Sequence, residues 1–201
     1  MIKFAVISPH APILLPDIGT VSDHQQIENT IRSLNQLGED FAKLNIDEII
    51  ISSPHRDWGF NVPLFFIAKN FSGKIHQFLC GEDSVNSYFL KGEKFAKKLD
   101  QKKSFAIIAS GDLSHVLTPD GPYGFHPDGP KFDKEFSDLL MRKNVEEILR
   151  LDKKYPFAAD CGMRSFAFTF GLLFGENSKL KSKILSYEAP FGVGYLVAKL
   201  I

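Results

Sequence analysis

Three histidines in this sequence each follow a short apolar run that is typical of a buried strand. His10 follows residues 2–8, His55 follows residues 47–53, and His115 follows residues 104–109. The carboxyl ends of parallel strands meet at one edge of a sheet, and open α/β sheets bind their ligands at that edge. Because neutral imidazole is a common metal ligand, the spacing predicts a metal site there.

His10 and His55 stand in the same tripeptide, Ser-Pro-His. Proline restricts the backbone of each turn, and a metal needs imidazoles that are held in a fixed orientation. A lone histidine is usually structural, but the same motif at two equivalent strand ends favours metal ligation. His115 is either a third ligand or a general base, and Asp112 either belongs to the same site or caps a loop.

The third protein ligand has three candidates. Two histidines and a carboxylate form the facial triad of non-haem Fe(II) oxygenases, and Asp160 and Glu188 are the best-placed carboxylates. A thiolate from Cys161 would suit Zn or Cu(I) better. The structural alternatives are a helix N-cap for Asp160, a surface charge for Glu188 and a small buried hydrophobe for Cys161.

Strands and helices alternate along the chain and must position these residues. Strand patterns lie at 2–8, 47–53, 63–68, 74–80, 104–109, 182–188 and 192–199, and helical patterns at 22–44, 84–99, 131–152 and 162–174. A strand, a long helix and a second strand favour a parallel pair with a right-handed crossover. The last two strands resemble an antiparallel hairpin. We therefore expect one α/β domain over residues 1–201, with a mixed, mostly parallel sheet.

The composition excludes several classes of protein. The chain has 201 residues, 44% of them hydrophobic, and its 24 basic side chains balance 24 acidic ones, so it lacks the basic surplus typical of nucleic-acid binding. Its first residues do not resemble a signal peptide, and no apolar run approaches the roughly 18 residues of a membrane helix. Two distant cysteines are too few for a disulfide framework, so we expect a cytoplasmic protein. Base rates alone favour a homodimer.

The motifs that carry a family resemblance are spread over the whole chain. They are Ser8-Pro9-His10-Ala11-Pro12, Ser53-Pro54-His55, Ser110-Gly111-Asp112-Leu113-Ser114-His115, Pro122-Tyr123-Gly124, Gly129-Pro130-Lys131-Phe132-Asp133 and Asp160-Cys161-Gly162-Met163-Arg164. Together they resemble the LigB-type class III extradiol ring-cleavage dioxygenases, and most closely the branch of AmmeMemoRadiSam system protein B and the Memo proteins.

This resemblance implies a three-layer α/β/α domain in which Fe(II) is held by two histidines and a carboxylate. His10 and His55 fall on the histidine-ligand positions, and His115 falls on the acid/base position. The third-ligand position falls near Asp160 and Cys161. The dioxygenases have glutamate there, whereas Memo-like members have cysteine within Cys-Gly-Arg, which the local sequence around Cys161 resembles.

The implied activity is cleavage of a catechol-type aromatic ring with O2. The metal, Fe(II) or alternatively Zn or Cu, would bind a vicinal diol, while His115 with Asp112 beside it would move the protons. The expected substrate-binding residues are Trp58, Phe60, Phe125, His126 and Glu188, although loop histidines such as His126 are often merely exposed.

Two alternatives to this activity remain open at the level of the sequence. One is a Memo-like metal-binding protein that acts with partners, such as an AmmeMemoRadiSam A-type protein and a radical-SAM protein. The other is a Zn-dependent hydrolase on the same scaffold. Ligation by Cys161 would favour the Memo-like alternative, and ligation by Asp160 or Glu188 would favour oxygen chemistry.

Overall fold

The structure is a computed structural model that describes all 201 residues. Its strands are β1 (Ile2–Ser8), β2 (Glu48–Ser53), β3 (Lys74–Leu79), β4 (Phe105–Ser110), β5 (Lys183–Glu188) and β6 (Tyr195–Lys199). Its α-helices are α1 (Val21–Gln26), α2 (Glu28–Ala42), α3 (Trp58–Ile67), α4 (Val85–Ala96), α5 (Asp128–Met141), α6 (Val145–Ile148), α7 (Leu151–Lys154) and α8 (Met163–Gly175), with a 3-10 turn, η1, at Pro12–Leu14.

The six strands form one sheet in the order β3-β2-β4-β1-β6-β5. β1 to β4 pair in parallel, while β6 is antiparallel to both β1 and β5. The sheet is therefore mixed and mostly parallel, with a hairpin at its C-terminal edge, which confirms the predicted fold class. In this register Ser8 pairs with Ser110, so β1 and β4 end at the same level, and β2 ends beside them.

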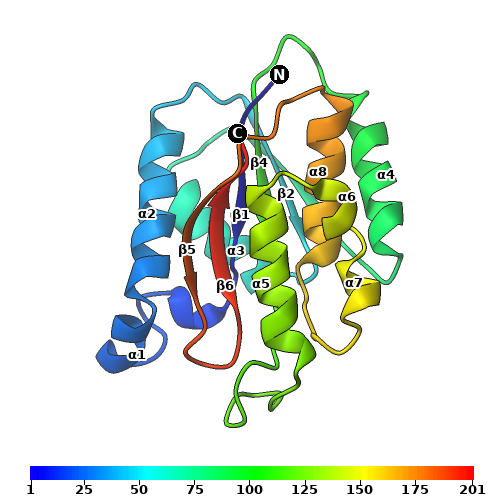
Figure 1. The fold of residues 1–201 in the computed structure, drawn as a ribbon. Coiled ribbons are helices and arrows are strands. Elements are labelled where there is room, and N and C mark those ends of the chain that lie inside the picture. The colour runs from blue at the N-terminus through cyan, green and yellow to red at the C-terminus, as the bar shows by residue number, and fades with distance from the viewer.

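Helices cover both faces of the sheet and give three layers (Figure 1). Alternate residues of the central strands point to opposite faces, as pleating requires. Ile7, Ile50 and Ile107 pack in one core beneath α4, α5 and α8, whereas Val6 and Ile108 pack in a second core beneath α2 and α3. The two cores fix the sheet from both sides, so its carboxyl edge is a rigid platform.

Two predicted elements differ from the structure. The helix expected over residues 22–44 is divided at Ile27 into α1 and α2. Residues 63–68 were expected to form a short strand, but residues 58–67 form the helix α3, with Pro63 inside it. A short apolar run has no periodicity that separates a buried helix from a buried strand, and proline argues against an interior helical position. None of the helices is both long and apolar enough to cross a bilayer.

Candidate metal centre

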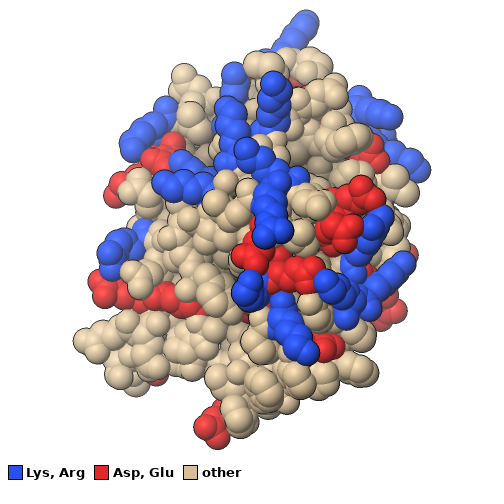
Figure 2. Space-filling model, viewed as in Figure 1, with Lys and Arg blue, Asp and Glu red and all other residues tan.

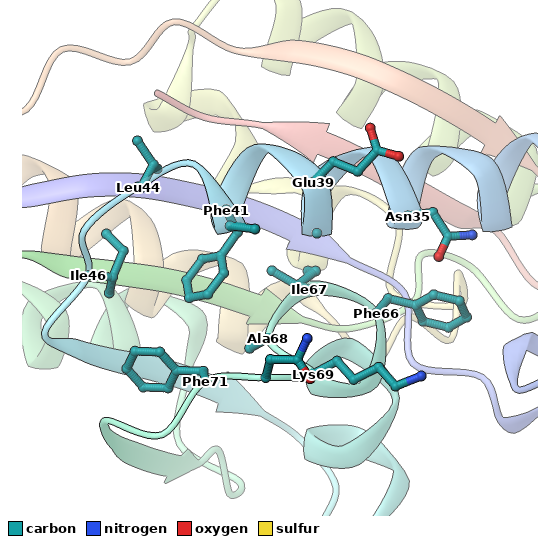
Figure 3. A pocket seen from close by; sticks show the side chains of 13 residues that line it. Asn35, Glu39, Phe41, Leu44, Ile46, Phe66, Ile67, Ala68, Lys69 and Phe71 are labelled. Carbon is teal, nitrogen blue, oxygen red and sulfur yellow. The ribbon is translucent and has the colours of Figure 1, made fainter.

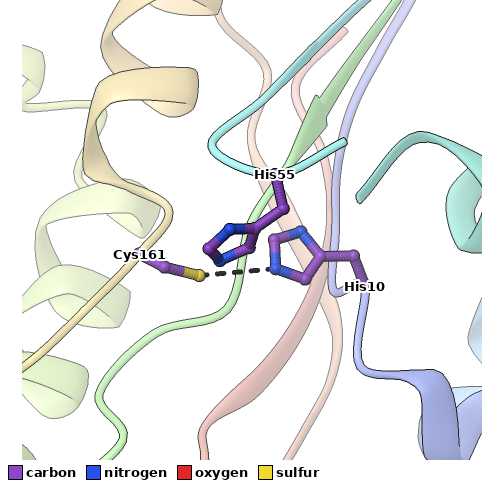
Figure 4. Close-up of side chains that lie close together, drawn as sticks. All are labelled: His10, His55 and Cys161. Carbon is purple, nitrogen blue, oxygen red and sulfur yellow. Dashed lines mark hydrogen bonds between the residues drawn. The ribbon is translucent and has the colours of Figure 1, made fainter. Parts of the chain in front are cut away.

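Three donor side chains from distant parts of the chain meet at the carboxyl edge of the sheet (Figure 4). The ligand atoms of His10, His55 and Cys161 all lie within 4.8 Å of one another. His10 Nε2 is 3.5 Å from Cys161 Sγ, and the two imidazole rings are 5.2 Å apart at an angle of 72°. The edge-on arrangement lets both rings direct a nitrogen toward one point.

Hydrogen bonds fix which nitrogen of His10 faces this point. The Ser110 hydroxyl donates to the Gly59 carbonyl and lies 2.9 Å from His10 Nδ1. Since that hydroxyl proton is used, the oxygen must accept from Nδ1–H, which leaves Nε2 unprotonated toward Cys161. The Gly59 carbonyl is free because its regular helical partner would be the backbone N–H of residue 63, which is proline.

A second group of donors overlaps the first. Ligand atoms of Asp112, His115 and Cys161 also lie within 4.8 Å of one another. His115 Nδ1 is 3.0 Å from the Leu113 carbonyl, which can only accept, so His115 carries its proton on Nδ1 and exposes a basic Nε2. Asp112 joins the two groups, because its Oδ1 accepts the backbone N–H of His10 at 3.0 Å.

Two glycines bring Cys161 to the strand ends. A Cβ on Gly111, after β4, would lie 2.3 Å from the Cα of Gly162, which precedes α8. The loop after β4 and the start of α8 therefore touch backbone to backbone, a contact that only glycine permits. This contact sets the Asp112 amide nitrogen 3.3 Å from Cys161 Sγ.

Burial at this site disfavours the charged forms of its side chains. Burial, with a smaller contribution from His55, lowers the pKa of His10 to about 3, so His10 is neutral at physiological pH. Burial also raises the pKa of the Cys161 thiol and of Asp112, and it lowers the pKa of His115. The neutral imidazole of His10, the imidazole of His55 and a thiol that ionises on metal binding are a donor set that fits a divalent cation.

Three candidate residues do not join this cluster. Asp160 lies outside it, and its Oδ1 accepts the Met163 N–H at 2.9 Å at the start of α8. Glu188 accepts four hydrogen bonds from Asn29 and Thr30, so it caps α2 rather than facing a substrate. Phe60 is 5% exposed and packs in the core beneath α3, because it faces the sheet.

Aromatic side chains flank the donors on both sides. Trp58 lies 5.8 Å from the His55 ring, and Tyr123, to which the sequence analysis gave no role, lies 5.5 Å from the His115 ring. Phe125 is exposed on the same loop, and the His126 ring lies 5.0 Å from exposed Phe157. Their loops follow β2 and β4, which explains why rings so far apart in sequence surround one site.

A buried carboxylate supports the loop that carries His115. Asp133 on α5 accepts the Ser114 N–H at 2.8 Å and the Tyr187 hydroxyl at 2.6 Å. Burial raises the pKa of Asp133 to about 7. The sequence analysis gave Asp133 no function, although an acidic residue between Phe132 and Phe136, on the apolar face of a helix, was a visible signal.

A larger hollow of the surface lies away from this centre. A cavity of about 480 Å³ opens between the C-terminal halves of α2 and α3, lined by residues such as Phe41, Phe66 and Phe71 (Figure 3). Its only charged residues are Glu39 and Lys69, and it contains no histidine or cysteine. The chemistry-bearing side chains are thus gathered at the opposite end of the sheet.

Two known proteins are similar to this chain over nearly its whole length. Protein CA_C1420 of Clostridium acetobutylicum is 31% identical over 264 aligned positions, which cover 96% of this chain and 56% of that protein. The chain therefore spans about half the length of this curated relative. The crystal structure of uncharacterized protein JW3007 from Escherichia coli K12 superposes with a TM-score of 0.58 at 12% identity, covering 98% of this chain and 99% of that one.

The family comparison covers most of the chain. Residues 55–198 match the family model of the catalytic LigB subunit of aromatic ring-opening dioxygenase. The match includes His55, His115 and Cys161, while His10 precedes it. This chain belongs to the LigB family.

Proposed function

We propose that this protein is a metal-dependent dioxygenase of the extradiol type, which opens a small aromatic vicinal diol with O2. The observation that carries the proposal is the convergence of His10 and His55 beside His115, whose Nδ1–H donates to the Leu113 carbonyl and leaves Nε2 as the basic nitrogen. Membership of the LigB family supports the same class of chemistry.

His10, His55 and Cys161 would hold the cation, which we infer to be Fe(II), with Zn and Cu as alternatives. A bound Fe(II) would supply Lewis acidity that lets a coordinated diol lose a proton at neutral pH. The neutral His10, with Nε2 directed toward Cys161, and the flanking His55 need little reorganisation to serve as ligands.

His115 is the proton acceptor in this proposal. Burial lowers its pKa, so it is neutral at pH 7, as a general base must be. Nε2 would take a proton from the second substrate hydroxyl and return one later in the reaction. The carboxylate of Asp112 favours the protonated imidazole, which stabilises the intermediate protonation state.

The test is oxygen consumption by anaerobically Fe(II)-reconstituted protein supplied with aromatic vicinal diols. We expect ring-opened products, detected by absorbance and mass spectrometry. The variant His115→Gln should retain iron but lose turnover by about 10²–10⁴-fold, as is typical for removal of a general base. His76→Gln, near the start of β3 and away from the site, is the matched control. Full turnover in His115→Gln would remove His115 from the mechanism.

A second candidate is favoured by one observation, the grouping of Cys161 rather than Asp160 with the two histidines. This donor set resembles that of a Memo-like metal-binding protein, which would act with partner proteins such as an AmmeMemoRadiSam A-type protein and a radical-SAM protein. Stoichiometric metal with no oxygen consumption across the whole diol panel would favour this candidate over the dioxygenase.

A further inference from the structure

Basic side chains are absent from most of the loops that surround the candidate metal centre. The chain has 24 lysines and arginines, yet none lies in residues 4–31, 104–130, 155–163 or 184–198. Those segments contain His10, His115, Cys161 and the turn of the C-terminal hairpin. In Figure 2 the lower end of the molecule, where these loops lie, accordingly shows few blue atoms, while lysine and arginine gather toward the termini.

Acidic side chains are present at the same end. Asp17, Asp57 and Asp120 are exposed on three different loops of the carboxyl edge. The exceptions to the depletion are Arg56, Lys131 in the first turn of α5, and Arg164 on α8, whose guanidinium donates to the Asp83 carbonyl at 2.8 Å. The mouth of the site therefore has a negative balance, and such a field concentrates cationic ligands and repels anionic ones.

The charge of the metal does not reverse this balance. A divalent cation held by the Cys161 thiolate, with the carboxylate of Asp112 beside it, gives a neutral centre, and a deprotonating diol adds negative charge. In the loops of residues 4–31, 104–130, 155–163 and 184–198 an anionic substituent on the diol would have no basic partner, and Arg56 is the one basic residue of the loop after β2. A cationic substituent would meet both acidic side chains and aromatic rings.

Two rings are placed to bind such a substituent. Trp58 and Tyr123 each lie against a proposed functional histidine, and they are 46% and 67% exposed. An aromatic face attracts an ammonium group within about 6 Å of its centroid. No lysine or arginine of the chain stacks on either ring, so both faces are open to a cation from a ligand.

We propose that the substrate of this site is an aromatic diol that carries an amine, rather than one that carries a carboxylate. The inference rests on the proposed dioxygenase function, and it adds the charge of the substrate to it. Trp58 and Tyr123 bind the ammonium group, and the metal ligands bind the diol.

The first experiment measures the electrostatic potential at the Cys161 thiol in the absence of any diol. The variant Cys80→Ala leaves Cys161 as the sole thiol. The rate at which Cys161 is modified is then measured with two methanethiosulfonate reagents, one with a cationic trimethylammonium-ethyl group and one with an anionic sulfonatoethyl group. Relative to a small free thiol, we expect the cationic reagent to be favoured about threefold or more at 10 mM salt, and the preference to shrink at 1 M salt. A preference for the anionic reagent, or none, would overturn the proposal.

Three variants test whether the preference for the cationic reagent arises at the site. Tyr123→Lys should abolish the cationic preference, and Tyr123→Phe, which keeps the ring, should preserve it. Asn70→Lys adds the same charge at an exposed position before β3, at the other end of the sheet, and should leave the preference unchanged. An equal loss in Asn70→Lys would mean that net charge rather than the site determines the rates, which contradicts the proposal.

The second experiment compares diols directly on Zn(II)-loaded protein under argon by calorimetry. The expected order of affinity is 4-(2-aminoethyl)catechol, then 4-methylcatechol, then 3,4-dihydroxybenzoate, with about tenfold between the first and the last at low salt. Tighter binding of the carboxylate would overturn the charge assignment. If no diol binds, the proposed function fails, and the thiol rates still decide the charge of the ligand that this site accepts.

Discussion

The two edges of the same sheet treat ionisable groups in opposite ways. At the amino edge, buried Glu48 at the start of β2 accepts hydrogen bonds from Lys103 and His76, both at 2.5 Å, and these bonds lower its pKa. At the carboxyl edge, Asp112 and Asp133 have no cationic partner, and burial raises the pKa of both.

The difference between the two edges distinguishes groups that stabilise the fold from groups that are suited to chemistry. Paired charges at the amino edge stabilise the fold, whereas desolvated, unpaired groups at the carboxyl edge cost stability. Buried ionisable groups without a charged partner persist where they serve chemistry, and they mark candidate sites when they converge on a surface. Four variants test this difference between the two edges.

The largest expected effect is the loss of metal in His10→Ala. Removing one of three protein ligands should weaken the binding of Zn(II) or Fe(II) by at least about a thousandfold, since each ligand supplies a large share of a metal site's binding free energy. Metal content after dialysis and competitive chelator titration measure the effect. His76→Ala, which removes a histidine at the amino edge, should bind metal like the natural protein. Equal losses in both variants would contradict a localised centre.

The second effect is a pH dependence that Asp133 creates. Its pKa is about 7 in the folded state and about 4 when unfolded, so the unfolded chain loses this proton first and stability falls as pH rises from about 4 to about 7. The full shift corresponds to at most about 4 kcal/mol. Asp133→Asn should flatten this part of the curve, measured by urea unfolding at pH 4.5 and 7.5.

A control on the same helix makes this prediction specific. Asp138 on α5 is exposed and bonded to Lys134, so Asp138→Asn should leave the fall between pH 4.5 and 7.5 intact. Parallel curves for Asp133→Asn and the natural protein would show that Asp133 does not titrate in this window.

The third effect follows from the close contact of Gly111 with Gly162. Gly111→Ala forces the loop after β4 away from α8, which should cost about 1–3 kcal/mol of stability and weaken metal binding, because Cys161 moves with α8. Thermal unfolding with and without metal measures both changes. In Gly81→Ala the new Cβ would meet only the Tyr88 hydroxyl, at 3.6 Å, so this variant should change neither.

The smallest effect tests the amino edge. Glu48→Gln should lose about 1 kcal/mol at pH 7, because the charged acceptor shared by the Lys103 ammonium group and the His76 ring becomes neutral. The lowered pKa of Glu48 means that its contribution is present above the unfolded pKa and is lost as pH falls through the folded pKa, so the difference between variant and natural protein should vanish in acid. Metal affinity should not change. A loss that grows in acid would contradict the ion-pair explanation.

The parts of the fold and site that the sequence predicts are those that depend on local pattern. Buried strands appear as continuous apolar runs, and the two Ser-Pro-His tripeptides sit directly after two of them. The choice of Cys161 over Asp160 could not be made in this way, because adjacent residues share the same loop and differ only in direction. That direction is set by the contact of Gly111 with Gly162, which joins segments about 50 residues apart.

Other residues escaped prediction for the same reason. Glu188 ends a strand, as expected, but nothing local indicates that α2 begins beside it and takes both of its carboxylate oxygens. Phe60 follows a histidine closely, yet the helical rotation of α3 turns it into the core. Long-range packing, not residue type, determined each of these outcomes.

Pro63 has a thermodynamic consequence beyond its place in α3. The carbonyl that it frees on Gly59 receives the Ser110 hydroxyl, and through this hydroxyl it orients His10, so cation affinity and the local unfolding of α3 are reciprocally linked. We expect a cation bound by His10 to slow amide hydrogen exchange along α3, and fraying of α3 to weaken the binding of that cation. Amide hydrogen exchange along α3, the helix that was expected to be a strand, would therefore report residue by residue whether His10 holds a cation.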